Sequence, residues 1–467
     1  MRATPRRILL VNPVVFSASR SPALALPLQP ALVSLYSYLV AHDVPVDVVD
    51  LQVELGPPAD MEGLESAMAA SVRLVRARDF DLLAISCNFS GAYLGAMEIA
   101  RAVREADAAV HIVVGGCHAT AVPEDFTGPG SPFDIVVRGE GEVELLALAR
   151  DVAERPSHTE VREGRPLPLD QAFVDFTGYP YWRPHPHYLL FPLSRGCPHA
   201  CTFCGGTERR SWRAYPPDVA LGVARTMIAT GPEVVAFSDA CFGLKPAWRR
   251  AVLTGLAEDA PGTALQWQTR TNALDRADID LMSGLDVMVE LGLETASPRM
   301  AELMSKTRDG ERYVRESREL LAALGARGVV SSLFLILNHP GEDARSLGET
   351  MDFVRDLSDQ AAELLACAHA NACAVLPGTS LLNEAERWQR ETGSIIGHPR
   401  WWHERGDQKA MAADVRTSVP WPIIAGAIEE IERLRAETIK AMPPSARFLW
   451  RRLNAPLPRP TTPRSTS

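Results

Sequence analysis

The sequence predicts an α/β protein: an N-terminal doubly wound parallel sheet, then a partial parallel barrel of six strand–helix units and a mostly helical C-terminal segment. Two observations indicate this class. Short apolar runs alternate with stretches of helical periodicity over residues 6–153 and again over residues 187–376. Glycines and small polar residues follow several of these runs, as is typical of the carboxyl ends of parallel strands, where ligands bind.

The N-terminal half contains five predicted buried strands separated by helices. The strands cover residues 8–11, 46–49, 82–86, 110–114 and 135–137. Because interleaved helices connect parallel strands, we expect one doubly wound domain over residues 1–153. Residues 154–186 are crowded with proline, charged and aromatic residues without periodicity, which is typical of an interdomain linker.

The second half contains six more predicted strands with helices between them. These strands cover residues 188–194, 233–238, 264–269, 287–293, 330–337 and 364–374. Six such units without a seventh and eighth predict an incomplete barrel over residues 187–385, with its chemistry at the carboxyl ends of the strands. In the C-terminal segment, residues 386–453, an apolar face predicts a helix over 421–441, and we expect a disordered tail over 454–467.

Composition and charge exclude several classes of protein. Apolar residues make up 46% and charged residues 23% of the 467 residues, which argues against a disordered or collagen-like chain. A net charge of −10 argues against nucleic-acid binding. The first apolar run is too short for a signal peptide, and no stretch is long enough to span a membrane. We therefore expect a cytoplasmic protein without membrane partners, whose clustered cysteines serve metal binding or catalysis.

Three cysteines lie close together directly after the first predicted barrel strand. Cys197, Cys201 and Cys204 have the spacing C-x3-C-x2-C, which eight cysteines in this chain would produce by chance only about 0.002 times. Three thiolates can hold three irons of a [4Fe–4S] cube and leave the fourth iron open to a ligand. Zinc is the alternative, with His199 as a fourth ligand, although its place between the first two cysteines would strain a compact loop.

This loop resembles the cluster-binding loop of the radical S-adenosylmethionine enzymes. The resemblance implies that the open iron binds the amino and carboxylate groups of S-adenosylmethionine. It also implies that Phe203 packs near the adenine and that Glu294, in a Gly-x-Glu-Thr strand end, accepts hydrogen bonds from this cosubstrate. The Met304-Ser305-Lys306 and Pro340-Gly341-Glu342 segments are similar to later family motifs. Where the family has Gly-x, this chain has Asn338-His339. The glycine that would permit a close backbone approach at this turn is therefore missing.

Pro377-Gly378-Thr379 is similar to the end of the barrel in one subgroup, which carries an N-terminal cobalamin-binding, Rossmann-like domain. Residues 6–153 resemble that domain. The implied cobalamin contacts are Asn12, Ser86, Asn88, Gly115, Gly116, His118, Gly139 and Glu140. The first strand is not followed by G-x-G-x-x-G, which argues against dinucleotide binding. An Asp-x-His-x-x-Gly motif is also missing, so we expect His118 to bond a corrin amide or a neighbour and not the cobalt.

Three further positions leave alternatives open. Asp239 ends the second barrel strand and could bind the cosubstrate or substrate, or cap the next helix. Arg270 ends a strand of period two and could reach a carboxylate at the barrel top or form a structural ion pair. Trp401 and Trp402 could line a substrate pocket, but we expect them to pack the C-terminal segment onto the barrel.

Together the resemblances imply a cobalamin-dependent radical S-adenosylmethionine methyltransferase. In the implied reaction, a reduced cluster cleaves S-adenosylmethionine, the 5′-deoxyadenosyl radical takes hydrogen from a substrate carbon, and methylcobalamin delivers the methyl group. We expect a small-molecule or peptide natural-product substrate and an electron donor such as flavodoxin or ferredoxin. Two alternatives stay open: a non-methylating reaction such as ring contraction or cyclisation, and a non-catalytic cobalamin and iron–sulfur sensor.

Overall fold

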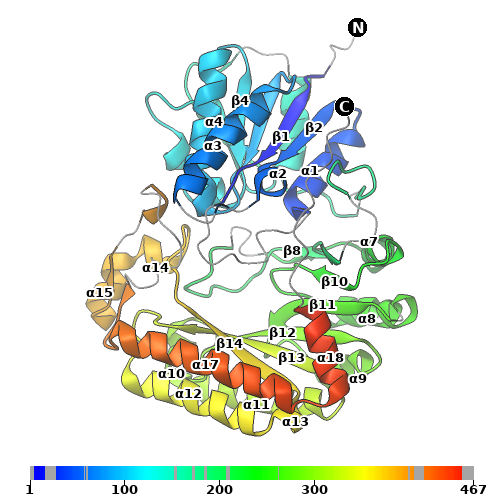
Figure 1. Cartoon of the computed structure of the whole chain (residues 1–467), viewed down its shortest axis with the longest axis vertical. Coiled ribbons are helices and arrows are strands. Elements are labelled where there is room, and N and C mark those ends of the chain that lie inside the picture. The colour runs from blue at the N-terminus through cyan, green and yellow to red at the C-terminus, as the bar shows by residue number, and fades with distance from the viewer. Residues whose placement is uncertain are drawn as a thin grey trace. The chain divides into compact units, whose positions relative to one another are not determined.

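The chain folds into two compact units (Figure 1). The computed structural model describes residues 5–15, 28–56, 58, 61–151, 155–170, 174–182, 187–206, 211–260, 262–397, 400–403 and 415–454. Among them, unit 1 contains the residues up to 182 together with 400–403. Unit 2 contains residues 187–397 and 415–454. The predicted fold class is confirmed.

Unit 1 is built on a parallel sheet of six strands in the order β2-β1-β3-β4-β5-β6. The strands are β1 (Ile8–Asn12), β2 (Val46–Asp50), β3 (Leu82–Ser86), β4 (His111–Gly115), β5 (Ile135–Arg138) and β6 (Glu160–Glu163). Every residue of β1 and β3 is buried, as expected for central parallel strands covered on both faces. The carboxyl ends of all six strands therefore meet at one edge, and this edge carries the small polar residues singled out above.

The sixth strand corrects one prediction. Residues 154–186 were expected to be a linker without regular structure, yet β6 lies within them and pairs with β5. Its sequence Glu-Val-Arg-Glu is charged and only partly buried. Charged residues are common on edge strands because they prevent pairing with other chains, and they also hide the strand from apolar patterning.

Helices of unit 1 connect its strands. They are α1 (Pro30–Val40), α2 (Leu51–Leu55), α3 (Met61–Arg76), α4 (Tyr93–Ala106), α5 (Cys117–Ala121) and α6 (Glu142–Arg150), with short 3-10 turns η2 (Ser90–Ala92) and η3 (Pro123–Phe126). Asp50 shows why α2 begins where it does: its carboxylate accepts the backbone N–H groups of Gln52 and Val53, which have no partner within the helix. The strand end and the helix start are thus fixed by one side chain.

Unit 2 contains the open barrel, a second parallel sheet of six strands in the order β14-β13-β12-β11-β10-β7. The strands are β7 (Tyr188–Leu190), β10 (Val234–Phe237), β11 (Ala264–Arg270), β12 (Val287–Glu294), β13 (Val330–Leu337) and β14 (Ala366–Ala372). A small antiparallel pair, β8 (Ser194–Arg195) and β9 (Arg213–Ala214), stands beside the cysteine loop. This order makes β7 and β14 the two edges of the barrel.

Most helices of unit 2 connect successive strands. They are α7 (Pro217–Ala229), α8 (Pro246–Asp259), α9 (Arg276–Met282), α10 (Pro298–Leu303), α11 (Gly310–Gly325), α12 (Ala344–Asp359) and α13 (Ala361–Leu364). After β14 follow α14 (Ser380–Asn383), α15 (Ala385–Thr392), the pair β15 (Ile395–Ile396) and β16 (Val415–Arg416), α17 (Trp421–Ala441) and α18 (Pro444–Leu453).

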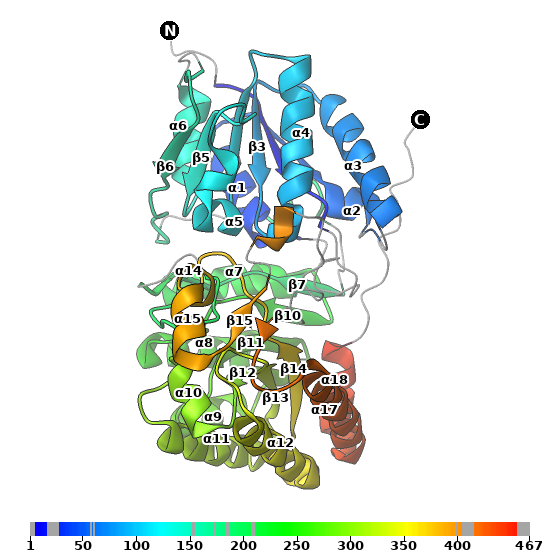
Figure 2. The same ribbon diagram turned by 90° about the vertical axis from the view of Figure 1, so that its left-hand side faces the viewer.

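The helix predicted over residues 421–441 is confirmed as α17. It runs beside edge strand β14 and packs on α12 (Figure 2). A helix that covers an edge strand prevents that strand from pairing with other chains. The following helix, α18, inserts Ala446, Trp450 and Leu453 into an apolar cluster with Val234 and Met288 of the barrel strands. One end of the barrel is therefore closed by the C-terminal helices.

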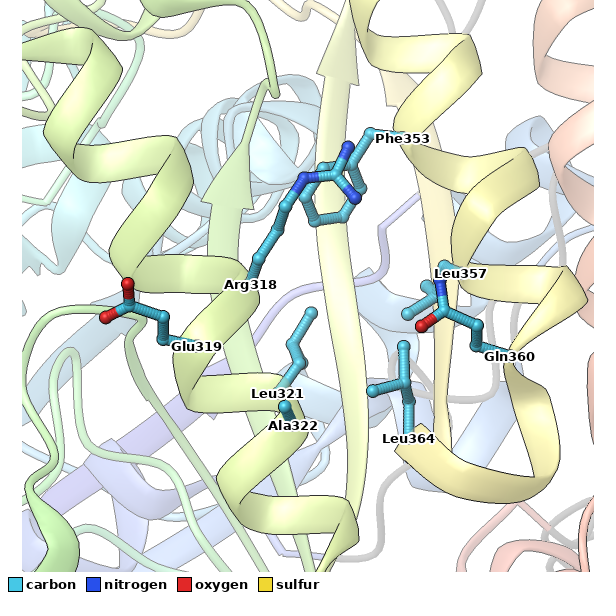
Figure 3. A pocket seen from close by; sticks show the side chains of 8 residues that line it. All are labelled: Arg318, Glu319, Leu321, Ala322, Phe353, Leu357, Gln360 and Leu364. Carbon is cyan, nitrogen blue, oxygen red and sulfur yellow. The ribbon is translucent and has the colours of Figure 1, made fainter.

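A surface cavity of about 310 Å³ lies between α11, α12 and α13 (Figure 3). Its wall includes Arg318, whose guanidinium lies over the ring of Phe353 at 4.2 Å. All of its lining residues belong to the helical layer or its connections and none to a strand end. The cavity is thus separate from the edge where a parallel barrel carries its chemistry. No helix among the described residues is long and apolar enough to cross a membrane.

Candidate functional site

The three clustered cysteines lie on one loop after β8 in unit 2. Cys201 is buried, Cys197 is half-buried and Cys204 is exposed. Burial raises the pKa of the Cys197 thiol, the nearby thiols raise it further, and the backbone N–H of His199 opposes this. Within the described part of the chain, no three His, Cys, Asp or Glu side chains form a group that could hold a single metal ion. The sulfurs therefore influence each other without converging on one point.

Contacts from three barrel strand ends hold this loop. Arg270, the last residue of β11, donates from Nη1 to Sγ of Cys201 at 3.3 Å. The backbone N–H of Thr202 donates to the carbonyl of Met304 at 3.1 Å, and its hydroxyl bonds Nε2 of His339 at 2.9 Å. Because these partners lie at the end of β11, directly after α10 and in the turn after β13, the loop can take its shape only when the barrel is assembled.

Arg270 forms no structural ion pair with a described carboxylate, and its contact with a carboxylate of the cosubstrate stays a prediction. Its guanidinium also donates to the carbonyl of Lys306 and to Oδ1 of Asn272, so its partners are a thiol, a carbonyl and an amide. None of these is a carboxylate. The buried guanidinium thus lies next to a cysteine sulfur of the loop.

Glu294 ends β12 and forms one unit with Gly292 and Lys306. Its carboxylate lies 3.3 Å from Nζ of Lys306, which also donates to the carbonyl of Gly292 at 2.7 Å. A Cβ at Gly292 would lie 2.7 Å from Oε1 of Glu294, so only glycine leaves room for this carboxylate. Burial is the largest single effect and opposes the charge on Lys306, but Glu294, Tyr313 and Cys201 together outweigh it and raise the pKa of Lys306.

The backbone at Glu294 is also unusual. Its φ is +72°, and the register between β12 and β13 shifts at this point. Residues other than glycine rarely adopt positive φ, and such conformations concentrate at functional sites. The bulge aims a carboxylate at the carboxyl end of the barrel, where it is 12% exposed.

Asp239 corrects a prediction. Helix α8 begins at Pro246, so Asp239 does not cap it. The fully buried carboxylate instead accepts the backbone N–H of Leu193 at 3.1 Å and the hydroxyl of Ser194. Burial raises the pKa of Asp239 to about 6, although these hydrogen bonds oppose the increase. Asp239 thus holds the chain just before the cysteine loop.

Asn338 explains how the turn after β13 tolerates the missing glycine. Its φ is +63°, a left-handed conformation that asparagine adopts more readily than most residues. Its Nδ2 donates to the carbonyl of Val415 at 2.8 Å, and its backbone N–H donates to Glu342. The turn brings the fully buried His339 onto Thr202, a contact that the sequence motifs did not indicate.

In unit 1, the residues proposed for cobalamin line the carboxyl edge of the sheet. Asn12 donates to Oδ1 of the buried Asp50 at 2.9 Å, and burial raises the pKa of Asp50 to about 6. The side chain of Asn88 donates to Ser86 at 3.0 Å and accepts the backbone N–H of Cys117 at 3.3 Å. These pairs join neighbouring strand ends into one surface.

The glycines at this edge permit close approach. Gly116 has a φ of +99°, and a Cβ there would lie 2.8 Å from the carbonyl of Cys87. Gly115 ends β4 beside Val137 of β5. Gly139, with a φ of +82°, donates its N–H to Thr120 at 2.9 Å, and Glu140 accepts the N–H of Leu167 at 2.8 Å. The two loops after β4 and β5 are thus tied together.

His118 is enclosed by protein. Its side chain is fully buried, with Nδ1 3.0 Å from Oγ of Ser90 and Nε2 3.4 Å from Asp125. The indole ring of Trp402 packs edge to face against its imidazole at 5.2 Å between centroids. Both ring nitrogens therefore face neighbouring side chains, and the absence of a cobalt bond to His118 stays a prediction.

The segment of residues 400–403 corrects the expected packing of the tryptophans. Trp402, which was expected to pack on the barrel, belongs to unit 1 and is 2% exposed. Its Nε1 donates to the buried carboxylate of Asp125 at 2.5 Å, and Nε2 of His403 lies 3.1 Å from the same carboxylate. Burial would raise the pKa of Asp125, but the hydrogen bonds from His118, His403 and Trp402 lower it.

Comparison with known proteins identifies both units. Residues 31–149 match the family model of the B12 binding domain, and residues 191–354 match that of the radical SAM superfamily. The chain belongs to the family of radical S-adenosylmethionine enzymes that carry a B12-binding domain.

Curated relatives are identical to this chain at about a quarter of the aligned residues. An uncharacterized methyltransferase of Pyrococcus horikoshii is 24% identical over 331 residues, which cover 64% of this chain and 69% of the relative. The 2-(S-pantetheinyl)-carbapenam-3-carboxylate methyltransferase of Streptantibioticus cattleyicolor is 25% identical over 57% of this chain and 44% of its own length. An anaerobic magnesium-protoporphyrin IX monomethyl ester cyclase of Cereibacter sphaeroides is 22% identical over 51% and 43%. The chain thus matches less than half the length of the last two.

Solved structures share the fold. TsrM from Kitasatospora setae, a radical S-adenosylmethionine methyltransferase solved with cobalamin and a [4Fe–4S] cluster, has a TM-score of 0.63 at 16% identity. The match covers 92% of this chain and 91% of that one. OxsB, solved with aqua-cobalamin and S-adenosylmethionine, has a TM-score of 0.64 at 16% identity, covering 92% and 66%. The order of the two domains is therefore shared over nearly the whole chain.

Proposed function

We propose that this chain is a cobalamin-dependent radical S-adenosylmethionine methyltransferase that methylates a carbon of a small-molecule or peptide substrate. The observation that carries this proposal is a series of side-chain contacts at the carboxyl end of the barrel. Arg270 links the cysteine loop to the carbonyl of Lys306, and Lys306 in turn holds the carboxylate of Glu294. Cysteine donors and a cosubstrate-type carboxylate are therefore positioned by the same residues.

The donor set fits an iron–sulfur cube with an open iron. Cys197, Cys201 and Cys204 would hold it, and the nearby Cys241 is buried against Thr269. Around these sulfurs, Arg270 donates to Cys201, and the backbone N–H of Gly206 donates to Cys204 at 3.4 Å. Such donors tune the reduction potential of a cluster. When bound, the cluster and S-adenosylmethionine supply reducing and hydrogen-abstracting chemistry, and cobalamin supplies the methyl group.

The residues around Glu294 would bind and orient the cosubstrate. The Lys306 ammonium restrains the Glu294 carboxylate, which leaves the second carboxylate oxygen to accept a hydroxyl or amine proton. Phe203, half-buried beside His339, offers an aromatic face on the cluster loop. Through its bond to Thr202, His339 would keep this loop in place without touching the reacting atoms.

Unit 1 would bind cobalamin at the carboxyl edge of its sheet. Ser86, Asn88 and Gly116 form a surface of small and polar groups there. Phe89 follows them and is 43% exposed, so its ring is available for contact with a macrocycle. The buried position of His118 supports binding without a histidine below the cobalt.

A second candidate is a non-methylating reaction on the same scaffold. Anaerobic magnesium-protoporphyrin IX monomethyl ester cyclases are among the relatives at 22–28% identity, and their names describe ring formation. A sensor without catalysis is the third candidate, but the arranged Glu294 and Lys306 pair is more than a sensor needs.

Two substrate-independent assays separate these candidates. Anaerobically reconstituted protein with strong reductant should cleave S-adenosylmethionine to 5′-deoxyadenosine, and cob(I)alamin on the protein should be methylated with release of S-adenosylhomocysteine. Glu294→Ala should slow the cleavage about a hundredfold, because misplacing a reactant by about 1 Å has this effect. It should leave cobalamin binding intact, and Glu349→Ala, on an exposed face of α12, should change neither.

Each result points to one candidate. Cleavage without cobalamin methylation would favour the non-methylating enzyme, and bound cofactors with neither reaction would favour the sensor. Once a methylated product is known, deuterium at the acceptor carbon should appear in 5′-deoxyadenosine. Methylation without that transfer would instead indicate a polar mechanism at a nucleophilic carbon.

A further inference from the structure

The barrel of unit 2 carries a polar layer on its inner face, one step below the residues assigned to the cosubstrate. Strand register defines rows of side chains on this face, because paired residues of parallel strands point the same way. The row at the cosubstrate level contains Arg270, Gly292, Phe334 and His369. The row below it contains Gln268, Glu290, Ser332 and Cys367. Below that row lies the apolar cluster closed by α18.

Glu290 is the charged group of this lower row. Nε2 of Gln266 donates to its Oε1 at 2.6 Å, and Oε1 of Gln266 accepts the hydroxyl of Tyr188 at 3.0 Å. Gln266 is thus held from below and presents its amide to one carboxylate oxygen. The second oxygen of Glu290 bonds no group within the described part of the chain, and it is not sealed from solvent.

Gln268 adds a second acceptor. Its Nε2 donates to the carbonyl of Asp239 at 3.0 Å, which leaves its carbonyl oxygen for another partner. Two basic side chains lie nearby, and both are paired with Glu432 of α17: Nδ1 of His369 at 2.5 Å, and Arg435, which also bonds Cys367, at 2.8 Å. Arg270 above the row is already bonded to Cys201 and Lys306.

One side of this row is open to solvent. Gln268 is exposed and Glu290 is half-buried, whereas Ser332 and Cys367 at the other side of the row are buried. Burial raises the pKa of Glu290, although Gln266 and His369 oppose this. A cation placed beside this carboxylate would replace the stabilisation that water no longer provides.

We infer that this inner layer is a substrate subsite that takes an ammonium or similarly donor-rich nitrogen group, held by Glu290 with Gln268 beside it. The inference rests on the proposed function, because it places the substrate in the same barrel. The second oxygen of Glu290 and the carbonyl oxygen of Gln268 can accept N–H groups of an alkylammonium, and the basic side chains nearby, His369 and Arg435, are already paired with Glu432.

Strand geometry also sets the spacing within the substrate. Two residues along a strand rise about 7 Å, so the Glu290 row lies about that far below the cosubstrate row. Allowing for a hydrogen bond of about 3 Å, the reacting carbon and the nitrogen are separated by a few bonds. An amino acid, an amine or the amino end of a peptide has this spacing.

The subsite can be tested with probes that share one ring and chain length. Anaerobically reconstituted full-length protein is titrated with 2-phenylethylamine, N-acetyl-2-phenylethylamine and 3-phenylpropionate, and binding is followed by ligand-observed NMR. The amine should bind at least tenfold more tightly than the other two. Glu290→Gln should weaken amine binding about tenfold or more and leave the acetamide unchanged. Glu437→Gln, an exposed glutamate of α17 paired with Arg433, is the matched control and should bind like the wild type.

Folding and the proposed function are checked separately. Glu290→Asp keeps the charge and should retain preference for the amine, and iron content with circular dichroism shows whether each variant is intact. Three results would overturn the subsite: equal affinities for the three probes, the same amine affinity in Glu290→Gln as in the wild type, or no amine binding up to about 10 mM. A dissociation constant above about 10 mM is a very weak affinity. Cleavage of S-adenosylmethionine by the wild type is measured on the same preparation, so its failure would count against the proposed function and not against amine recognition.

Discussion

Glu342 offers a sharp test of how the turn beside the cysteine loop is built. Its side chain is buried, and one carboxylate oxygen accepts the backbone N–H of Asn338. The other oxygen has no hydrogen-bond partner within the described part of the chain. Burial raises the pKa of Glu342 to about 7, although the bond from Asn338 and the charge of Arg299 oppose this. The group therefore holds its proton more tightly in the folded state than in the unfolded chain.

The magnitude follows from linkage. Raising the pKa from 4.5 to about 7 is worth about 3 kcal/mol of unfolding free energy, at about 1.4 kcal/mol per pH unit. Below pH 4.5 the carboxyl is protonated in both the folded and the unfolded state, so its titration does not reduce the free energy of unfolding. Between pH 4.5 and about 7 the unfolded chain loses its proton first, so stability falls as the pH rises, and the loss is complete above that range.

Glu342→Gln removes this titration and keeps an oxygen for the N–H of Asn338. The variant loses stability by a constant amount, since the new amide N–H groups lack partners, but that loss does not depend on pH. Relative to the wild type, Glu342→Gln should therefore gain about 3 kcal/mol between pH 5 and pH 8. For a domain of this size, the melting temperature of the variant minus that of the wild type should therefore rise by about 6–12 °C from pH 5 to pH 8.

Calorimetry of anaerobically prepared protein at the two pH values measures this difference. Comparing variant with wild type cancels the other titrating groups, including the buried Asp50 and Asp239, whose pKa values burial also raises. Asp352→Asn, at an exposed site on α12, serves as the control and should show no pH-dependent difference of this size. A Glu342→Gln difference that is the same at pH 5 and pH 8 would show that the carboxyl is not kept neutral by burial.

Three further outcomes are expected. The triple change of Cys197, Cys201 and Cys204 to Ala should abolish a cluster of about four irons and its absorption near 400 nm, and stoichiometric zinc in the wild type would contradict the iron–sulfur proposal. Bound cob(II)alamin should show no nitrogen splitting in its paramagnetic resonance spectrum, in the wild type or in His118→Ala; splitting that disappears in the variant would place His118 on the cobalt. Trp402→Phe should destabilise unit 1 by about 1.5–3 kcal/mol, since Asp125 loses a charge-assisted hydrogen bond, and an unchanged unfolding transition would show that the contact contributes little.

Local patterns in the sequence determined much of the fold and the outline of the site. Alternating apolar runs and helical periods predicted both sheets, because a parallel strand buries a continuous short run and a helix repeats every 3.6 residues. The spacing of Cys197, Cys201 and Cys204 within eight residues indicated the cluster, and the apolar face over residues 421–441 predicted α17. Each of these signals lies within one element or one loop.

Tertiary structure alone decided which partners the side chains take. Trp402 meets Asp125 across 277 residues of sequence, and Thr202 meets His339 across 137. For Arg270 the sequence left a carboxylate at the barrel top or an ion pair open and did not indicate its contact with Cys201, and for Asp239 it did not indicate the bonds that hold the chain before the cysteine loop. Such contacts depend on how whole elements pack, and neither periodicity nor spacing along the chain carries that information, because a buried polar side chain bonds whichever complementary group the fold brings within reach.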